Sequence, residues 1–192
     1  MKKILIINGH PDKESFNDAL INAYCKGLNA SSSEVSIIVI RDLQFNPNLQ
    51  YGYRKRTELE PDLLAAIEKI KSADHIVWVF PVWWFGSPAI MKGFIDRTFL
   101  PGITFEAIPG KPFIRKLLVG KTAHLIVTAD TPRWYDILFM GSPALNQLKK
   151  GTLELCGIKV KKVSYIAPMK DCSAAFREKW LTRVERLAAA LK

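Results

Sequence analysis

The sequence predicts an α/β domain built on a doubly wound parallel sheet. Short apolar runs alternate along the chain with longer segments of helical period, which is the pattern of βαβ units. The chain has 192 residues, of which 48% are hydrophobic, and it shows neither an internal repeat nor a low-complexity linker. We therefore expect one domain over residues 1–192, with five strands in the order 2-1-3-4-5 and helices on both faces.

Five apolar runs rich in Ile, Val and Leu are the expected strands. They show little alternation of apolar and polar residues, which is typical of strands that helices cover on both faces. We expect all five to be central or nearly central in the sheet. They are Lys3–Asn8, Glu34–Arg41, His75–Phe80, Ala123–Thr128 and Lys159–Ile166.

Helical periodicity lies between and after these runs. In the last helix, Phe176, Trp180 and Val184 belong to one apolar stripe, which indicates core packing. The expected helices are Ser15–Leu28, Pro61–Ser72, Pro88–Phe99, Ser142–Leu155 and Ser173–Leu191. Two segments do not fit this rhythm, namely Gln44–Glu58 and Leu100–Val119, and both are candidates for contact with a partner or with the rim of a site.

Composition and charge exclude several classes of function. The net charge is +10, but the basic residues are dispersed and form no nucleic-acid-binding motif, so we expect no nucleic-acid partner. Since no apolar run is long enough to span a bilayer, we expect no stable membrane insertion and a cytoplasmic location. Cys25, Cys156 and Cys172 lack metal-ligand spacing, so we expect reduced structural thiols and no metal.

The loop after the first strand is a candidate phosphate site. It runs over Asn8–Asn17 and opens directly into a helix, where backbone N–H groups and Ser15 can meet an anion. A plain strand-to-helix turn with a Ser cap explains the same residues equally well. A P-loop is excluded, because Arg115 stands five residues before Gly120-Lys121-Thr122 and a strand follows them.

Aromatic residues gather after the third strand. Trp83, Trp84 and Phe85 stand between Pro81 and Pro88, at the turn from strand to helix. Their flat rings suit the walls of a pocket for a planar heteroaromatic ligand. The alternative is a large plug in the core between helix and sheet.

Polar and aromatic residues also follow the fourth strand, over Thr128–Tyr135. Because the carboxyl ends of parallel strands meet at one edge of a sheet, all three loops should converge there. This convergence favours a binding site more strongly than any one loop does.

The motifs, taken in this order, resemble those of the NAD(P)H:quinone oxidoreductase family of flavodoxin-like flavoproteins. That family includes the mammalian quinone reductases, bacterial modulators of drug activity and ancillary proteins of potassium efflux systems. The resemblance covers about the first three quarters of the chain. Its motifs are Gly9-His10-Pro11 with Ser15-Phe16-Asn17, Asp42-Leu43 through Phe45-Asn46-Pro47, Pro81–Phe85 through Pro88-Ala89, Lys92-Gly93, Asp96-Arg97 and Phe99, and Thr128 with Trp134-Tyr135.

The resemblance implies roles for individual residues. His10, Ser15, Phe16 and Asn17 would hold the flavin phosphate or pyrophosphate. The isoalloxazine ring would lie against Pro81, Val82, Trp83, Trp84 and Phe85, with Thr128, Ala129 and Asp130 at its far edge. Tyr135 is similar to the family's catalytic tyrosine, whereas Gly141 stands where the family has a histidine.

The resemblance also implies an activity. The chain would transfer hydride from NADH or NADPH through FAD, or FMN, to a quinone or another flat acceptor by ping-pong exchange, as a homodimer. Trp83–Phe85 and Leu100–Phe113 are the segments expected at the dimer interface. The alternatives are a flavodoxin-type electron carrier, which the basic charge disfavours, and a flavin-binding regulatory subunit of a membrane transporter.

Overall fold

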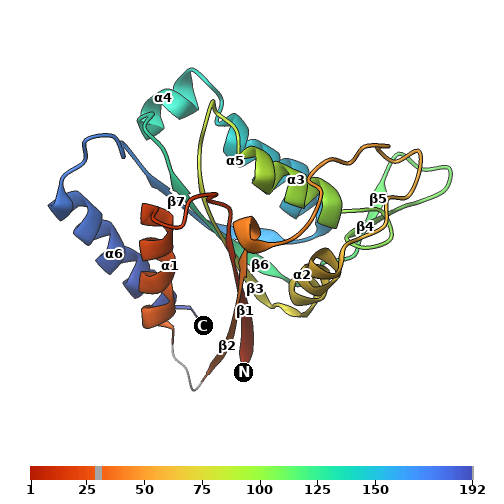
Figure 1. The fold of residues 1–192 in the computed structure, drawn as a ribbon, viewed down its shortest axis with the longest axis horizontal. Coiled ribbons are helices and arrows are strands. Elements are labelled where there is room, and N and C mark those ends of the chain that lie inside the picture. Colours follow the sequence, from red (N-terminus) through yellow and green to blue (C-terminus); the bar gives the residue numbers. More distant parts are fainter. Residues whose placement is uncertain (29–31, 192) are drawn as a thin grey trace.

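A parallel sheet forms the centre of the protein. The computed structural model describes residues 1–28 and 32–191, and in this part of the chain five strands form that sheet. The order is β2-β1-β3-β6-β7, which confirms the predicted order 2-1-3-4-5 (Figure 1). The strands are β1 (Lys2–Asn8), β2 (Ser33–Val39), β3 (His75–Pro81), β6 (Thr122–Thr128) and β7 (Lys159–Ile166).

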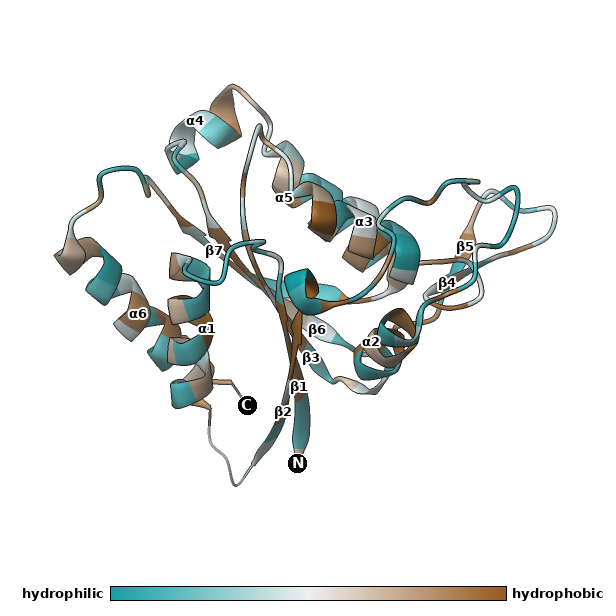
Figure 2. Ribbon diagram, in the orientation of Figure 1, coloured by the Kyte–Doolittle hydropathy of each residue, from teal (hydrophilic) through white to brown (hydrophobic). Residues whose placement is uncertain are grey.

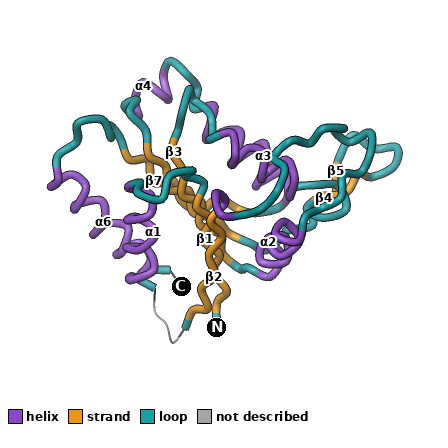
Figure 3. Tube along the Cα trace, viewed as in Figure 1, coloured by secondary structure: helices purple, strands orange, loops and turns teal. Residues whose placement is uncertain are grey.

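Helices cover both faces of the sheet, as the sequence predicts (Figures 1 and 3). One face carries α1 (Phe16–Gly27) and α6 (Ala174–Ala189), which pack on each other. The other face carries α2 (Pro61–Ser72), α3 (Ala89–Thr98) and α5 (Pro143–Leu148).

Alternation along the central strands produces two apolar cores. Ile4 and Ile6 of β1 belong to the core under α1 and α6, whereas Leu5 and Ile7 belong to the core under α2 and α3. Every residue of β3 is buried. The sheet is accordingly brown with hydrophobic residues where the helix layers meet it (Figure 2).

The expectation that all five strands are central or nearly so is wrong for β2 and β7. These two strands form the edges of the sheet, and both have exposed positions. In β7 the exposed residues include three lysines, Lys159, Lys161 and Lys162, which disfavour pairing with another strand. β2 also ends two residues earlier than predicted, because Ile40–Asp42 form the 3₁₀-helix η1.

Several short elements were not predicted, and one predicted helix is divided. The segment after β6 contains α4 (Arg133–Leu138), and the long segment before β6 contains an antiparallel hairpin of β4 (Phe105–Ala107) and β5 (Ile114–Lys116). The predicted helix Ser142–Leu155 consists of α5 followed by the π-helix η2 (Lys149–Glu154). Elements of three to six residues carry too few side chains to show a clear period.

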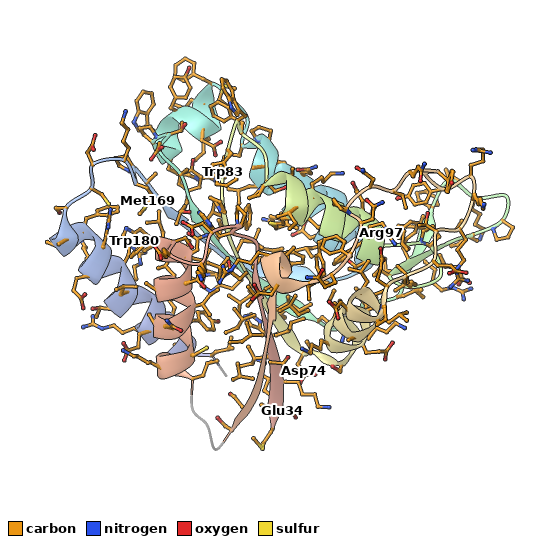
Figure 4. All side chains as sticks on the ribbon, viewed as in Figure 1. Glu34, Asp74, Trp83, Arg97, Met169 and Trp180 are labelled. Atoms are coloured by element: carbon orange, nitrogen blue, oxygen red, sulfur yellow. The ribbon has the colours of Figure 1, made fainter. Side chains whose placement is uncertain are left out.

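A buried arginine holds the long loop between η1 and α2. Arg97 of α3 is 1% exposed, and its guanidinium donates to the carbonyl oxygens of Asn46 and Glu58 and to the carboxylate of Glu60. The Glu60 carboxylate also accepts from the N–H of Asn46, at 2.9 Å. Gly93 permits the close approach of this loop, because a Cβ there would lie 2.4 Å from Cβ of Pro47. Figure 4 shows Arg97 between α3 and this loop.

We expect Arg97→Met to lower the free energy of unfolding by about 2–3 kcal/mol, because it leaves the half-buried Glu60 carboxylate and two carbonyl groups without their donor. Urea denaturation measures this loss. Lys92→Met is the matched control, since Lys92 forms an exposed ion pair with Asp96 on the same helix and should cost at most about 0.5 kcal/mol. Equal costs for the two variants would show that Arg97 does not hold the loop.

Candidate functional site

The carboxyl ends of β1, β3 and β6 open into one cavity of about 390 Å³. The predicted convergence of the three loops is thus observed in the structure. Ten residues singled out from the sequence line this cavity: His10, Ser15, Phe16, Asn17, Pro81, Val82, Trp83, Thr128, Ala129 and Asp130.

A second hollow of about 460 Å³ adjoins the first, and the two share Val82, Trp83 and Asp130 as lining residues. Trp84 and Phe85, the remaining two residues predicted to contact the cofactor, line this second hollow. The two hollows together form an open trough along the carboxyl edge of the sheet.

The loop after β1 begins with a buried asparagine. Asn8 is fully buried; its Nδ2 donates to Oδ1 of Asp18 at 3.2 Å, and its Oδ1 accepts the N–H of His10 at 3.0 Å. Gly9 follows, and a Cβ there would lie only 2.6 Å from Sδ of Met91. These two residues fix the direction in which the loop leaves the sheet.

An ion pair that the sequence analysis missed holds the rest of this loop. Arg41, in η1, donates to the Asp18 carboxylate at 2.9 Å and to the carbonyl oxygens of His10 and Asp12 at 3.3 Å. Burial by itself would raise the pKa of Asp18, but hydrogen bonds from Arg41, Ser15 and Asn8 outweigh it and lower that pKa. The sequence signal for this ion pair was Asp18, an acid in the first turn of the predicted helix.

Ser15 occupies the N-cap position of α1, as predicted, but its hydroxyl does not cap the helix. It donates instead to Oδ2 of Asp18, at 2.9 Å. The N–H groups of Phe16 and Asn17 in the first turn have no hydrogen-bond partner within the described chain. The start of α1 therefore presents unpaired donors to the cavity, as anion sites at helix N-termini do.

Asn17 provides the observation that points most directly to a ligand. It is 2% exposed, and its Oδ1 accepts the hydroxyl of Thr128 at 3.0 Å. Its Nδ2 is buried and has no partner among the described residues. An unpaired buried donor costs about 1–3 kcal/mol, and Asn17 is one of the residues that line the cavity.

His10 is held as a neutral donor. Its Nδ1 accepts the N–H of Asp12 at 3.0 Å, which leaves the proton on Nε2. Burial lowers the pKa of His10 despite the nearby Asp12 and Asp18 carboxylates, which raise it. The ring also meets that of Trp83 edge to face, with centroids 5.6 Å apart. His10 thus links the loop after β1 to the aromatic turn.

The aromatic turn has unusual backbone geometry. Trp84 and Phe85 have φ angles of 48° and 55°, and Trp83 and Gly86 are joined by hydrogen bonds of 3.0 Å and 2.9 Å. Two successive left-handed residues are characteristic of a type I′ turn, which normally requires Asn or Gly. The turn leaves Trp84 99% exposed, so the alternative of a core plug is wrong. Strain of this kind is typical of ligand-binding segments.

Part of the cavity lining comes from the segment after β7 and the start of α6, which the sequence analysis did not include in the site. Met169, Lys170 and Arg177 line the cavity there, and the labels of Met169 and Trp83 lie near the same end of the sheet in Figure 4. The N–H of Met169 donates to the carbonyl of Ala129, and the N–H of Lys170 donates to the Asp130 carboxylate at 2.6 Å. The convergence rule applied to the fifth strand would have identified this segment.

Tyr135 lies on α4 and is not among the described residues that line the two hollows. Its ring stacks on that of Phe139 with centroids 5.0 Å apart, and it remains partly exposed. Its catalytic role therefore stays a prediction from the family pattern.

Other groups that could form a site lie outside the trough. A cavity of about 310 Å³ lies between the loop around Tyr53 and Leu100–Ile103, away from the strand ends. His75 and His124 hydrogen-bond to Thr122 and Ser164, and burial lowers their pKa values to about 4 and about 3. All three cysteines are free, and within residues 1–28 and 32–191 neither a metal-binding cluster of His, Cys, Asp or Glu nor a bilayer-spanning helix is present.

Comparison with known proteins gives consistent results. A sequence profile described as "Flavodoxin-like fold" matches residues 2–188. The ribosyldihydronicotinamide dehydrogenases [quinone] of Pongo abelii and Homo sapiens are 31% and 30% identical to the chain, and each alignment covers 83% of this chain and 78% of the relative.

Solved structures agree. A protein from Streptococcus mutans UA159 superposes with a TM-score of 0.85 at 28% identity, covering 98% of this chain and 100% of its own. The NAD(P)H:quinone oxidoreductase of Methanothermobacter marburgensis superposes with a TM-score of 0.83 at 20% identity, covering 100% and 99% of the two chains, which supports the fold.

The chain therefore belongs to the flavodoxin-like family. Within that family it groups with the NAD(P)H quinone dehydrogenases, as the resemblance drawn from its motifs predicts.

We expect Asp18→Asn to lower the free energy of unfolding by about 1–2 kcal/mol at neutral pH, because it weakens the charge-assisted bonds to Arg41 and Ser15. Since the pKa of Asp18 is lower in the folded state, the wild-type advantage is fully present above the ordinary value of 3.8 and is lost as the pH falls through the folded-state pKa. Urea denaturation of both proteins across this range measures the difference. If the difference in unfolding free energy between the two proteins persisted unchanged below that pKa, the ionised Asp18 carboxylate would not be what stabilises the loop.

Proposed function

We propose that the protein is a flavin-dependent NAD(P)H:quinone oxidoreductase whose flavin binds in the trough at the carboxyl edge of the sheet. The observation that carries the proposal is the buried, unpaired Nδ2 of Asn17 beside unpaired N–H groups at the start of α1. A phosphorylated ligand supplies acceptors for all of these donors. The family of the chain supports the choice of a flavin.

In this proposal each wall of the trough has one task. Ser15, Phe16 and Asn17 bind the phosphate through their backbone and amide donors, and neutral His10 adds its Nε2–H. Pro81, Val82, Trp83, Trp84 and Phe85 pack against the flat ring system, while Thr128, Ala129 and Asp130 meet its edge. Tyr135 acts beside the ring and stabilises charge there.

FAD is the flavin that we propose, with FMN as the variant that the experiment below tests. Lys170 and Arg177 add two cations to the lining of the cavity. The diphosphate of FAD matches this second basic site better than the single phosphate of FMN does.

When bound, the flavin accepts hydride from NADH or NADPH and passes it to a quinone. Because the trough is open on one side, the nicotinamide and the acceptor can occupy the same place in turn, as a ping-pong scheme requires. We place the protein in the cytoplasm as a homodimer, with Trp83–Phe85 and Leu100–Phe113 at the interface. The exposed rings of Trp84 and Phe113 favour these segments.

Reconstitution of the purified chain with FAD and, separately, FMN tests the proposal. We expect the chain to retain a flavin. Its absorption at about 450 nm should fall when NADH or NADPH is added and return when menadione is added. Tyr135→Phe should retain flavin and slow the bleaching. Failure to retain either flavin would overturn the proposal, and retention without bleaching would favour the regulatory alternative.

The assignment of Asn17 gives a sharper prediction. Asn17→Ala should weaken flavin binding about tenfold or more, because it removes a buried donor to the ligand. The same change also removes the Oδ1 acceptor of the buried Thr128 hydroxyl, so it should lower the free energy of unfolding of the flavin-free chain by about 1–3 kcal/mol, and flavin affinity is compared under conditions in which the variant is folded. Asn146→Ala is the matched control: Asn146 is an exposed asparagine of α5, and its removal should leave flavin affinity unchanged. Fluorescence titration measures both affinities, and equal losses would contradict the assignment.

A further inference from the structure

The cavity of about 310 Å³ between residues 49–59 and 100–103 is separate from the trough. None of the described residues that line it lines either hollow of the trough. The two segments that form it lie beside α2 and the hairpin of β4 and β5, on the side of the molecule away from α6 (Figure 1). We call it the loop cavity.

Hydrogen bonds hold both walls of the loop cavity. In one wall the N–H of Gly52 donates to the carbonyl of Leu49 at 2.8 Å, and in the other the N–H of Ile103 donates to the carbonyl of Leu100 at 3.1 Å. The buried Arg97 holds the first of these loops near its end. The shape of the cavity is therefore fixed by the fold.

Most of the cavity surface is apolar. Leu49, Leu59, Leu100 and Ile103 are half-buried, and all four line the cavity. Tyr53 adds a ring that is 69% exposed. Since pockets for small molecules measure about 300–1,000 Å³, a ligand here has a small, mainly aliphatic body.

The polar part of the lining is basic. Lys55 and Arg56 are its charged residues, and both are exposed. The Lys55 ammonium lies over the ring of Tyr51, 5.1 Å from its centroid. Thr57 also lines the cavity, and its Oγ1 is buried and has no hydrogen-bond partner among the described residues. Cations beside an aliphatic surface favour a ligand with an apolar body and an anionic head.

A second copy of the chain does not match these charges. The segments proposed for the dimer interface, Trp83–Phe85 and Leu100–Phe113, contain one acid, Glu106. Its carboxylate forms an ion pair with Arg115 at 3.1 Å. Although residues 100–103 belong both to that segment and to the cavity wall, the interface as proposed brings no free acid to the two cations.

We infer that the loop cavity binds a small organic anion with an aliphatic body, such as a medium-chain fatty acid. The chain of the ligand lies against the leucines and Ile103, and its carboxylate meets Arg56 and Lys55. The inference goes beyond the proposed function and does not depend on it, because the site shares no lining residue with the trough.

Isothermal titration of the full chain, with whatever flavin it retains, tests the inference. We expect decanoate to bind more tightly than decan-1-ol and acetate not to bind, because only decanoate combines the apolar body with the charge. Arg56→Gln should lower the affinity for decanoate about fivefold and leave that for decan-1-ol unchanged. Arg54→Gln is the matched control, since Arg54 is an exposed arginine of the same loop that does not line the cavity, and it should change neither affinity.

A second variant tests the apolar part of the site. Tyr53→Ser removes a mostly exposed ring, so it should leave the fold intact while weakening decanoate and decan-1-ol alike by about threefold. Thermal unfolding checks that each variant is folded.

Three results would overturn the inference. The first is absence of decanoate binding by the wild type, or equal losses in Arg56→Gln and Arg54→Gln. The second is displacement of decanoate by added FAD, which would place the fatty acid in the trough. The third is altered self-association of Arg56→Gln without decanoate binding by the wild type, which would assign the cavity to a contact between two copies.

Discussion

The parallel pairing of β1, β3 and β6, buried on both faces, is the constraint on which the site depends. Alternate residues of these strands pack into one core with α1 and α6 and into another with α2, α3 and α5. Because both faces are covered, the strands cannot slide without moving two cores at once. Their carboxyl ends are therefore held in register, and the three loops that leave them are brought to one edge.

Two arginines then determine how the loops at this edge are held. Arg41 donates to carbonyl groups of the loop after β1 and to the Asp18 carboxylate. Arg97 likewise donates to carbonyl groups of the loop before α2 and to the Glu60 carboxylate. A guanidinium suits this task because its several N–H groups can satisfy carbonyl and carboxylate oxygens simultaneously. Each arginine also requires those partners, since removing one would leave a poorly solvated charge. The two loops are consequently held in place by hydrogen bonds between these guanidinium groups and the oxygens of the loops.

Features that are unfavourable for an isolated chain gather beyond this scaffold, at one edge. They include the left-handed backbone of Trp84 and Phe85, the unpaired amide of Asn17 and the outward apolar side of α4. Other buried polar atoms without a partner, such as Nε1 of Trp78 and Nε2 of His75, belong to residues that line neither hollow. A ligand in the trough would supply an acceptor for the amide of Asn17. The structure thus separates a stable scaffold from an edge that is prepared for partners.

Much of this could be predicted from the sequence, because it depends on local pattern. Apolar runs and helical periods predicted the strands and the layers, and the turns after β1, β3 and β6 predicted the place of the cavity. The resemblance of the motifs to a known family then identified ten of its lining residues. The predicted order 2-1-3-4-5 already places β2 and β7 at the edges of the sheet, whereas the apolar composition of these two runs wrongly indicated central positions. The partners of Asp18 and Arg97 lie 23 and 37 residues away in the chain, at Arg41 and Glu60. The left-handed turn at Trp84, the unpaired Nδ2 of Asn17 and the outward apolar side of α4 likewise arise only when distant segments pack together. The sequence by itself determined the framework and the place of the site, whereas only the tertiary structure decided which donors are left unpaired and which apolar side chains face outward, because both depend on contacts between residues far apart in the chain.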